Sequence, residues 1–391
     1  MTDQVVWSSS SADVTIASET VGNVTTGEAV VGATATSGQN VTVSATLSGL
    51  EATATLSINS FAYVYSEVNP FGLSLFRVDS ESGALTSIGS VSFSPADRPN
   101  SGLAVHPTGR FVYATTANPS PGYISLYLVD PMTGALTLSP TTYQAANSPR
   151  AMTVDPTGRF LYAANNLGDT VSTLAVDLVN GSLNRLSPGP ILNGPPATEE
   201  PTSVAVHPSG RYLYTANSLS YDVSFYKVDP ETGTLSDKET IPVPGVGRLA
   251  GIAIDPSGTY AFIGTSNGQA SQAISYRIES DGGLTEIGRN STGAFVSQVA
   301  IDPSGRFAFA VCGSGLLRAY SLQPAALPIA SGHEFSGSTV NGIAFDPSGR
   351  FAYVSSRNGG AIHAFAFRAQ GLTTTYTSYP CVFPVDLVIT P

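Results

Sequence analysis

The chain repeats one alternation of apolar and polar positions. Each copy has a short run of small and β-branched residues, a turn of the Asp-Pro-Ser-Gly type, and two aromatic residues separated by one position, most clearly in residues 342–355. Residues two apart point to the same face of a strand, so each copy predicts a strand, a turn and a second strand. Asp first, Pro second and Gly last are the residues that a type I turn favours.

The copies recur at steps of 44 to 52 residues. The turn prolines are Pro107, Pro156, Pro208, Pro256, Pro303 and Pro347. The aromatic pairs are Phe61/Tyr63, Phe111/Tyr113, Phe160/Tyr162, Tyr212/Tyr214, Tyr260/Phe262, Phe307/Phe309 and Phe351/Tyr353. The 17 Phe and 17 Tyr residues of the chain number 34 together, and these seven pairs account for fourteen of them. We therefore expect the pairs to form the core.

A third apolar run follows each pair, and most copies continue into a second hairpin turn, as in residues 129–136 and 228–235. Four short strands per copy at a fixed period are typical of a β-propeller blade. No copy has an apolar pattern at helical period, which excludes a helical solenoid.

The two ends of the repeat region complement each other. The first copy begins near Ile58 without an opening strand, and residues 385–391 match an opening strand and its turn proline. A strand from the far end would complete the first blade and remove an exposed sheet edge. The sequence therefore predicts an all-β, seven-bladed β-propeller over residues 58–391, closed by its C-terminal strand.

Residues 1–57 have a different pattern, rich in Thr, Ser, Val, Ala and Gly. Residues 41–47 and 52–58 alternate at period two around Ser48-Gly49, which predicts a hairpin. The order of these segments resembles the later strands of a bacterial immunoglobulin-like (group 2) domain. We therefore expect either a partial module of that kind or a Ser/Thr-rich β arm that acts as a spacer.

Charge and composition limit the classes of partner that we expect the protein to bind. Charged residues make up 12% of the chain, the net charge is −11, and the lysines number two, Lys227 and Lys238. A nucleic-acid-binding surface needs clustered cations, so we expect no nucleic-acid partner. No run of 18 apolar residues occurs, so we expect no membrane span. A closed ring has no edge to pair, which favours a monomer.

Recognisable cofactor motifs are absent from the sequence. It has no metal-ligand spacing, calcium loop, phosphate loop or nucleophile motif, so we expect neither a metal nor a cofactor. Cys312 and Cys381 are expected to be two separate buried side chains rather than a disulfide. The first seven residues do not form a signal-peptide pattern, but the immunoglobulin-like resemblance favours an extracellular, cell-surface or periplasmic location.

Function on a rigid ring is usually carried by the loops at one mouth of its channel. The segments that lead into the inner strands meet there, together with the loops that follow the second strands. A small molecule, protein or glycan is the expected ligand at this mouth. The candidate binding residues are Arg98, Asn166, Arg248, Gln298, Asn341 and Arg357.

The copies 151–165 and 228–235 resemble the seven-bladed lactonase propellers, the family of 6-phosphogluconolactonase and carboxymuconate lactonising enzymes. The family's catalytic pattern reads Pro-Arg-His into one inner strand and Asn-Glu-Leu after the next. Here the matching text is Pro149-Arg150-Ala151 and Asn165-Asn166-Leu167. The resemblance implies that Arg150 polarises a lactone carbonyl. The histidine and glutamate are replaced by Ala151 and Asn166, which cannot act as general bases.

Two hypotheses follow from these replacements. The first is a propeller without catalytic activity that binds a ligand or partner, or acts as a scaffold, through its loop face. The second is a lactone hydrolase in which Arg150 is the electrophilic group that polarises the carbonyl. In this hypothesis a carboxylate on the rim of the channel mouth acts as the base. Asp386 is a candidate base because it enters the closing strand at the position that Ala151 has in its own strand, and Glu200 lies on the same rim.

Overall fold

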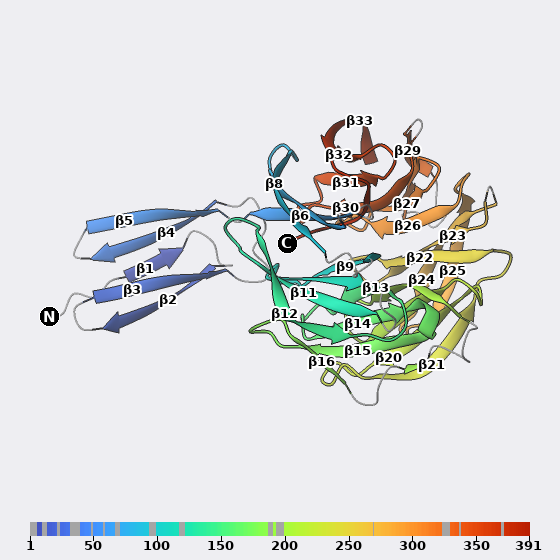
Figure 1. The fold of residues 1–391 in the computed structure, drawn as a ribbon, viewed down its shortest axis with the longest axis horizontal. Coiled ribbons are helices and arrows are strands. Elements are labelled where there is room, and N and C mark those ends of the chain that lie inside the picture. Colours follow the sequence, from blue (N-terminus) through green and yellow to red (C-terminus); the bar gives the residue numbers. More distant parts are fainter. Residues whose placement is uncertain are drawn as a thin grey trace.

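Each sequence repeat folds into a four-stranded antiparallel sheet in the computed structural model (Figure 1). The structure describes residues 6–9, 14–21, 24–31, 40–47, 50–57, 59–66, 71–93, 99–116, 122–186, 191–192, 199–268, 270–322, 329–335, 338–368 and 371–391. Seven of these sheets follow one another around a ring, one of them with a fifth short strand, which confirms the predicted all-β propeller.

The four strands of each blade follow one another from the centre of the ring outwards. Blade 1 contains β34 (Pro384–Ile389), β6 (Ser60–Ser66), β7 (Gly72–Val78) and β8 (Leu85–Ser92). Blade 2 contains β9 (Pro99–Val105), β10 (Phe111–Thr116), β11 (Tyr123–Val129) and β12 (Leu136–Gln144). Blade 3 contains β13 (Pro149–Val154), β14 (Phe160–Asn165), β15 (Thr170–Val176) and β16 (Leu183–Arg185), with β17 (Ile191–Leu192) also on β15 and the 3₁₀ turn η1 (Asn166–Gly168) after β14.

The remaining blades repeat this order. Blade 4 contains β18 (Pro201–Val206), β19 (Tyr212–Asn217), β20 (Asp222–Val228) and β21 (Leu235–Pro242). Blade 5 contains β22 (Arg248–Ile254), β23 (Tyr260–Ser266), β24 (Gln272–Ile278) and β25 (Leu284–Ser291). Blade 6 contains β26 (Val296–Ile301), β27 (Phe307–Cys312), β28 (Leu316–Ser321) and β29 (Ile329–Glu334). Blade 7 contains β30 (Val340–Phe345), β31 (Phe351–Ser356), β32 (Ala361–Arg368) and β33 (Gly371–Pro380).

Burial follows the position of a strand within its blade. The second strands β6, β10 and β14 are buried along their whole length, because adjacent blades cover both of their faces. The outer strands β8 and β21 have mostly exposed residues. Cys312 and Cys381 are buried and free, as predicted.

At five of the seven junctions, the aromatic pair of one blade joins it to the next blade. In blade 1 the Tyr63 hydroxyl donates a hydrogen bond to the Gly134 carbonyl in the β11–β12 turn of blade 2, at 3.1 Å. Phe61 packs on the same glycine, and a Cβ there would lie 2.2 Å from its ring. The same hydroxyl-to-glycine bond recurs from Tyr113, Tyr162, Tyr214 and Tyr353, to Gly181, Gly233, Gly282 and Gly83 respectively. The last of these bonds links blade 7 to blade 1.

The ring is closed by the C-terminal strand, as the sequence predicted. β34 pairs antiparallel with β6, with Asp386 opposite Tyr65 and Leu387 opposite Val64. In four repeats the turn aspartate accepts a hydrogen bond from the backbone N–H five residues later, as Asp346 does from Phe351. At the closure Thr390 takes that position, and its Oγ1 accepts from the Phe61 N–H at 2.9 Å. The closing strand therefore reproduces the repeat's own turn between residues far apart in the chain.

The N-terminal segments form two further sheets. β1 (Val6–Ser9), β4 (Asn40–Leu47) and β5 (Leu50–Ser57) make one, and β2 (Val14–Val21) pairs with β3 (Val24–Val31) in the other. β4 and β5 form the predicted hairpin, with Val41 opposite Leu56. Within the described part of the chain, no helical segment has the length and apolarity needed to cross a bilayer.

Substitution of Thr390 by Val tests the closure. The change removes the acceptor of the buried Phe61 N–H while keeping a β-branched side chain, so we expect the free energy of unfolding to fall by about 1–3 kcal/mol. Urea denaturation followed by tyrosine fluorescence or circular dichroism measures this loss. Thr137, an exposed residue of β12, is the matched control, and an equal loss in Thr137→Val would contradict the role given to Thr390.

Candidate active site

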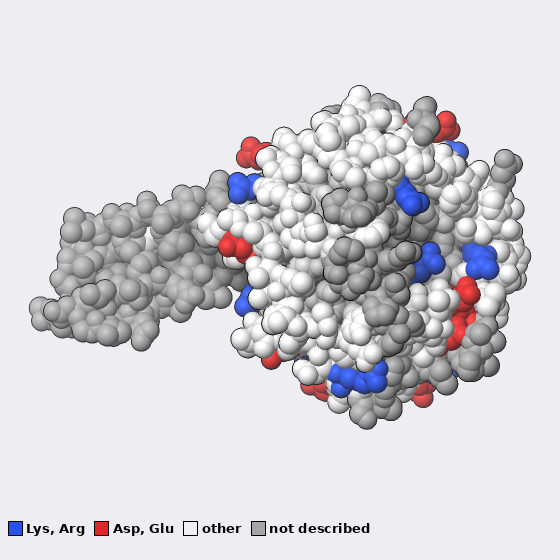
Figure 2. Space-filling view, in the orientation of Figure 1, with Lys and Arg blue, Asp and Glu red and all other residues white. Residues whose placement is uncertain are grey.

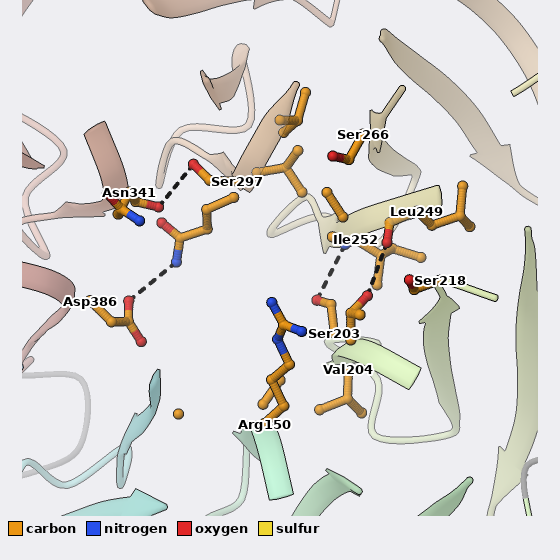
Figure 3. Close-up of a pocket in the computed structure, with 18 of the residues that line it drawn as sticks. Arg150, Ser203, Val204, Ser218, Leu249, Ile252, Ser266, Ser297, Asn341 and Asp386 are labelled. Atoms are coloured by element: carbon orange, nitrogen blue, oxygen red, sulfur yellow. Dashed lines mark hydrogen bonds between the residues drawn. The ribbon is translucent and has the colours of Figure 1, made fainter. Parts of the chain in front are cut away.

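A cavity of about 580 Å³ lies where the inner strands converge (Figure 3). Every one of the seven inner strands contributes to its lining, through residues such as Gly102, Arg150, Ser203, Gln298, Asn341 and Asp386. The predicted gathering of these segments at one mouth of the channel is therefore present, and the cavity is large enough for a small molecule.

A β-bulge near the start of each inner strand directs side chains into this cavity. In blade 3 the pairing of β13 with β14 shifts between Pro149 and Ala151, so Arg150 is the extra residue. The same shift lies between Val340 and Gly342 in blade 7, and between Pro384 and Asp386 in blade 1. Bulges re-aim side chains and are frequent next to active sites. Here the bulge turns Arg150 towards the centre of the cavity (Figure 3).

Arg150 is the cation most open to a ligand in this cavity. Its side chain is exposed and makes no ion pair within the described ranges. On the described part of the face seen in Figure 2, charged side chains are few, and most of the surface is uncharged. A guanidinium without a carboxylate partner has all its N–H donors available to an oxygen-rich ligand.

Asp386 lies on the cavity wall at the position predicted from the repeat. It is paired with Tyr65 of β6 just as Ala151 is paired with Ala164 in blade 3. Both residues therefore occupy equivalent positions along their inner strands, which we call the same level of the ring. Burial raises the pKa of Asp386 to about 7. Hydrogen bonds from the backbone N–H groups of Leu387 and Leu103 and from the Gln298 amide act in the opposite direction.

Glu200, the other predicted base, is engaged elsewhere. Its carboxylate forms an ion pair with Arg248 at 3.3 Å, and Arg248 also donates to the Ser218 hydroxyl at 3.1 Å. Arg248 and Ser218 line the cavity, whereas Glu200 is not part of the lining. The structure therefore brings together Arg150, Asp386 and Arg248, and Glu200 neutralises the last of these.

The remaining predicted residues differ in where they lie. Gln298 and Asn341 line the cavity, and the Asn341 Oδ1 is buried without a hydrogen-bond donor among the described residues. Asn166 and Arg357 are not in the cavity lining: Asn166 is buried and donates to the Pro201 carbonyl, and Arg357 is exposed. Arg98 lies outside the described residues.

Ser203 is a polar residue of the cavity wall that reasoning from the sequence missed. Ser203 lies opposite Ala216 directly after the bulge of blade 4, which is the ring level of Asp386 and Gln298. Its hydroxyl accepts from the Ile252 N–H at 3.3 Å. Alignment of the repeats by their aromatic pairs would have shown that all three residues share one position.

Comparison with known proteins agrees with this architecture. The family model described as "Lactonase, 7-bladed beta-propeller" matches residues 52–196 and 199–326, well over half of the chain. The chain belongs to this lactonase propeller family. A model for the WD domain, G-beta repeat, matches residues 327–362, which are part of blades 6 and 7 of the lactonase propeller.

Curated relatives of this lactonase propeller match over shorter stretches. A 6-phosphogluconolactonase of Pectobacterium carotovorum is 29% identical over 198 residues, which are 48% of this chain and 56% of that protein. A 6-phosphogluconolactonase of Formosa agariphila is 28% identical over 92 residues, or 24% of this chain and 26% of the relative. The chain thus aligns with about a quarter to just over half of the length of these relatives.

Solved structures share the fold at lower identity. The periplasmic gluconolactonase PpgL of Pseudomonas aeruginosa has a TM-score of 0.72 and 20% identity, over 85% of this chain and 99% of that one. A protein from Lactobacillus plantarum has a TM-score of 0.70 and 17% identity, over 85% and 100% of the two chains. At these identities the likeness extends to the propeller fold of the lactonase family.

Replacing Asp386 by Asn tests its burial. A carboxyl whose pKa is near 7 in the folded protein binds a proton that the unfolded chain releases near pH 4. Wild type should therefore lose stability relative to Asp386→Asn as the pH rises from 4 to 7, by on the order of 3–4 kcal/mol. Denaturant titrations at pH 4, 5.5, 7 and 8 measure the difference.

The exposed Asp237 provides the control for that experiment. Asp237→Asn removes a carboxylate whose ion pair with Lys227 is solvent-exposed, so its effect should stay within about 1 kcal/mol at every pH. A difference between wild type and Asp386→Asn that does not change with pH would show that Asp386 ionises normally.

Proposed function

We propose that this propeller hydrolyses lactones in its central cavity, with Arg150 as electrophile and Asp386 as proton acceptor and donor. The supporting observation is that one cavity holds an exposed guanidinium without an ion pair and, on another part of its wall, a half-buried carboxyl group with a pKa near neutrality (Figure 3). Membership of the lactonase family and relatives named as lactonases favour this reaction over ligand binding alone.

The chemistry follows from the two groups. Arg150 would donate hydrogen bonds to the lactone carbonyl oxygen and stabilise the negative charge that develops there during attack. Ionised Asp386 would take a proton from water as that water adds to the carbonyl carbon. Cleavage of the ring C–O bond then releases an alkoxide, which recovers the proton from Asp386 and leaves a hydroxy acid. A pKa near 7 suits a group that must accept and return a proton at neutral pH.

This assignment moves the base to another blade. The matching family pattern has a histidine where this chain has Ala151, and Ala151 and Asp386 lie at the same ring level in blades 3 and 1. A carboxylate supplied by blade 1 could therefore act on the same cavity as a base supplied by blade 3. The small Ala151 side chain leaves the Arg150 side of the cavity open to the substrate.

The resemblance of residues 1–57 to part of an immunoglobulin-like domain stays a prediction, as does the division of the chain at residue 57. The hairpin β4–β5 supports a β module in this segment. Such a module would attach the propeller to a partner or surface outside the cytoplasm, and this role is compatible with catalysis in the cavity.

Lactonase assays with purified protein test the proposal. Glucono-δ-lactone and 6-phosphoglucono-δ-lactone are suitable probes, with spontaneous opening subtracted. We expect Arg150→Ala to lower kcat/KM by about 10²–10³-fold, and Asp386→Asn by about 10²–10⁴-fold with loss of the pH dependence near 7. Arg77→Ala, a change at an exposed residue of β7 outside the cavity, should leave kcat/KM unchanged.

Two results would separate the hypotheses. Wild-type protein that opens neither lactone above the spontaneous rate would favour a binding propeller. Activity that survives both cavity substitutions would place the reaction elsewhere in the chain.

A further inference from the structure

The side chain of Gln298 connects two blades across the cavity wall. Its Oε1 accepts a hydrogen bond from the Ile343 N–H of blade 7 at 2.5 Å. Its Nε2 donates to the Asp386 Oδ1 of blade 1 at 3.4 Å. Gln298 itself belongs to β26 of blade 6, so one amide connects three consecutive blades.

The direction of the amide is determined by its surroundings. A backbone N–H can only donate, so the Gln298 oxygen must face Ile343 and the NH₂ group must face the carboxylate. A donor aimed at a carboxylate stabilises the ionised form. The Leu387 N–H donates to the same Oδ1 at 2.9 Å, and the Leu103 N–H also donates to this carboxylate. The second carboxylate oxygen faces the open cavity in Figure 3.

The positions of Gln298 and Asp386 along their strands explain how this hydrogen-bonded bridge between blades can form. Gln298 is paired with Val311, Gly342 with Ser355, and Asp386 with Tyr65, so the three residues hold equivalent positions in blades 6, 7 and 1. The middle position carries no side chain. A Cβ on Gly342 would lie 3.0 Å from the Val385 carbonyl oxygen and 3.3 Å from the Asp386 Cα, which is too close without movement of the strand that holds Asp386.

No charged side chain competes for Asp386 from the strands packed against it. The sequences of β9 and β30 contain no ionisable residue, and β6 and β31 contribute only tyrosines, Tyr63, Tyr65 and Tyr353. The charged groups that share its cavity are Arg150 and Arg248, and the latter is paired with Glu200. Among side chains, Gln298 is therefore the neighbour best placed to orient this carboxylate.

We propose that Gln298 is a positioning residue for Asp386: its amide holds one carboxylate oxygen and keeps the other directed into the cavity as the proton acceptor. This role rests on the lactone hydrolysis proposed above. It also differs from the direct ligand binding expected for Gln298 from the sequence, because both ends of the amide are occupied by protein.

The substitution Gln298→Met removes the donor and nearly preserves the volume of the side chain. With this variant, the acid limb of the kcat/KM–pH profile should move up by about 0.5–1 pH unit, because the ionised carboxylate loses a hydrogen bond. At pH 6 kcat should fall several-fold with little change in KM. Gln298→Glu places a second carboxyl beside Asp386, so its acid limb should move further in the same direction.

The matched control is Gln272→Met. Gln272 accepts a hydrogen bond from Arg289 on the outer part of blade 5 and is outside the cavity, so its pH profile should coincide with that of wild type. Unfolding free energies of all variants show whether a shift reflects loss of structure.

Direct titration of Asp386 tests the role of Gln298 independently of whether the protein hydrolyses lactones. Carbon-13 NMR of aspartate-labelled protein, with Asp386→Asn used for assignment, reports its ionisation without any substrate. A titration that moves upward in Gln298→Met supports the bridge even if the wild type opens no lactone. Coincident titrations of Asp386 in wild type and Gln298→Met would overturn it.

Discussion

The structure depends on the contact between an aromatic pair and a glycine turn of the next blade. A buried tyrosine hydroxyl and a phenylalanine ring enclose the same glycine, as Tyr63 and Phe61 do with Gly134. Any side chain on that glycine would collide with the ring, and a buried hydroxyl without its carbonyl acceptor would cost about 1–3 kcal/mol. At five of the seven junctions this contact fixes the distance and rotation between neighbouring blades, so the inner strands reach the channel at regular levels.

That regularity makes the cavity a set of equivalent positions filled with different residues. The level after the bulge carries Asp386, Ala151, Ser203 and Gln298 in four of the blades, with glycine at Gly342 in a fifth. The bulge adds a second level, to which Arg150 belongs. A ring of this kind changes its chemistry by substitution at single positions, while the apolar contacts between blades stay the same. The proposed use of a base from blade 1 in place of one from blade 3 would be an example.

Much of the fold could be predicted because its determinants are local and repeated. The aromatic spacing and turn prolines predicted the blades, and the unmatched ends predicted the pairing of β34 with β6. The repeat alignment also placed Asp386 at the level of Ala151. The pairing of Glu200 with Arg248, the burial of Asn166 and the bridge from Gln298 could not be predicted in this way. Each depends on the direction of a side chain between blades, which the repeat pattern does not specify.

Closure by β34 has a consequence for the order in which the protein is synthesised. Phe61 and Thr390 are 329 residues apart, so the innermost strand of blade 1 is translated after every other strand of the ring. Until then β6 has a free edge, which on a nascent chain invites pairing with the wrong strand. Contacts of such long sequence separation also form slowly. The blade that leaves the ribosome first is thus the last to be completed, and the cavity residue Asp386 arrives only with that final step.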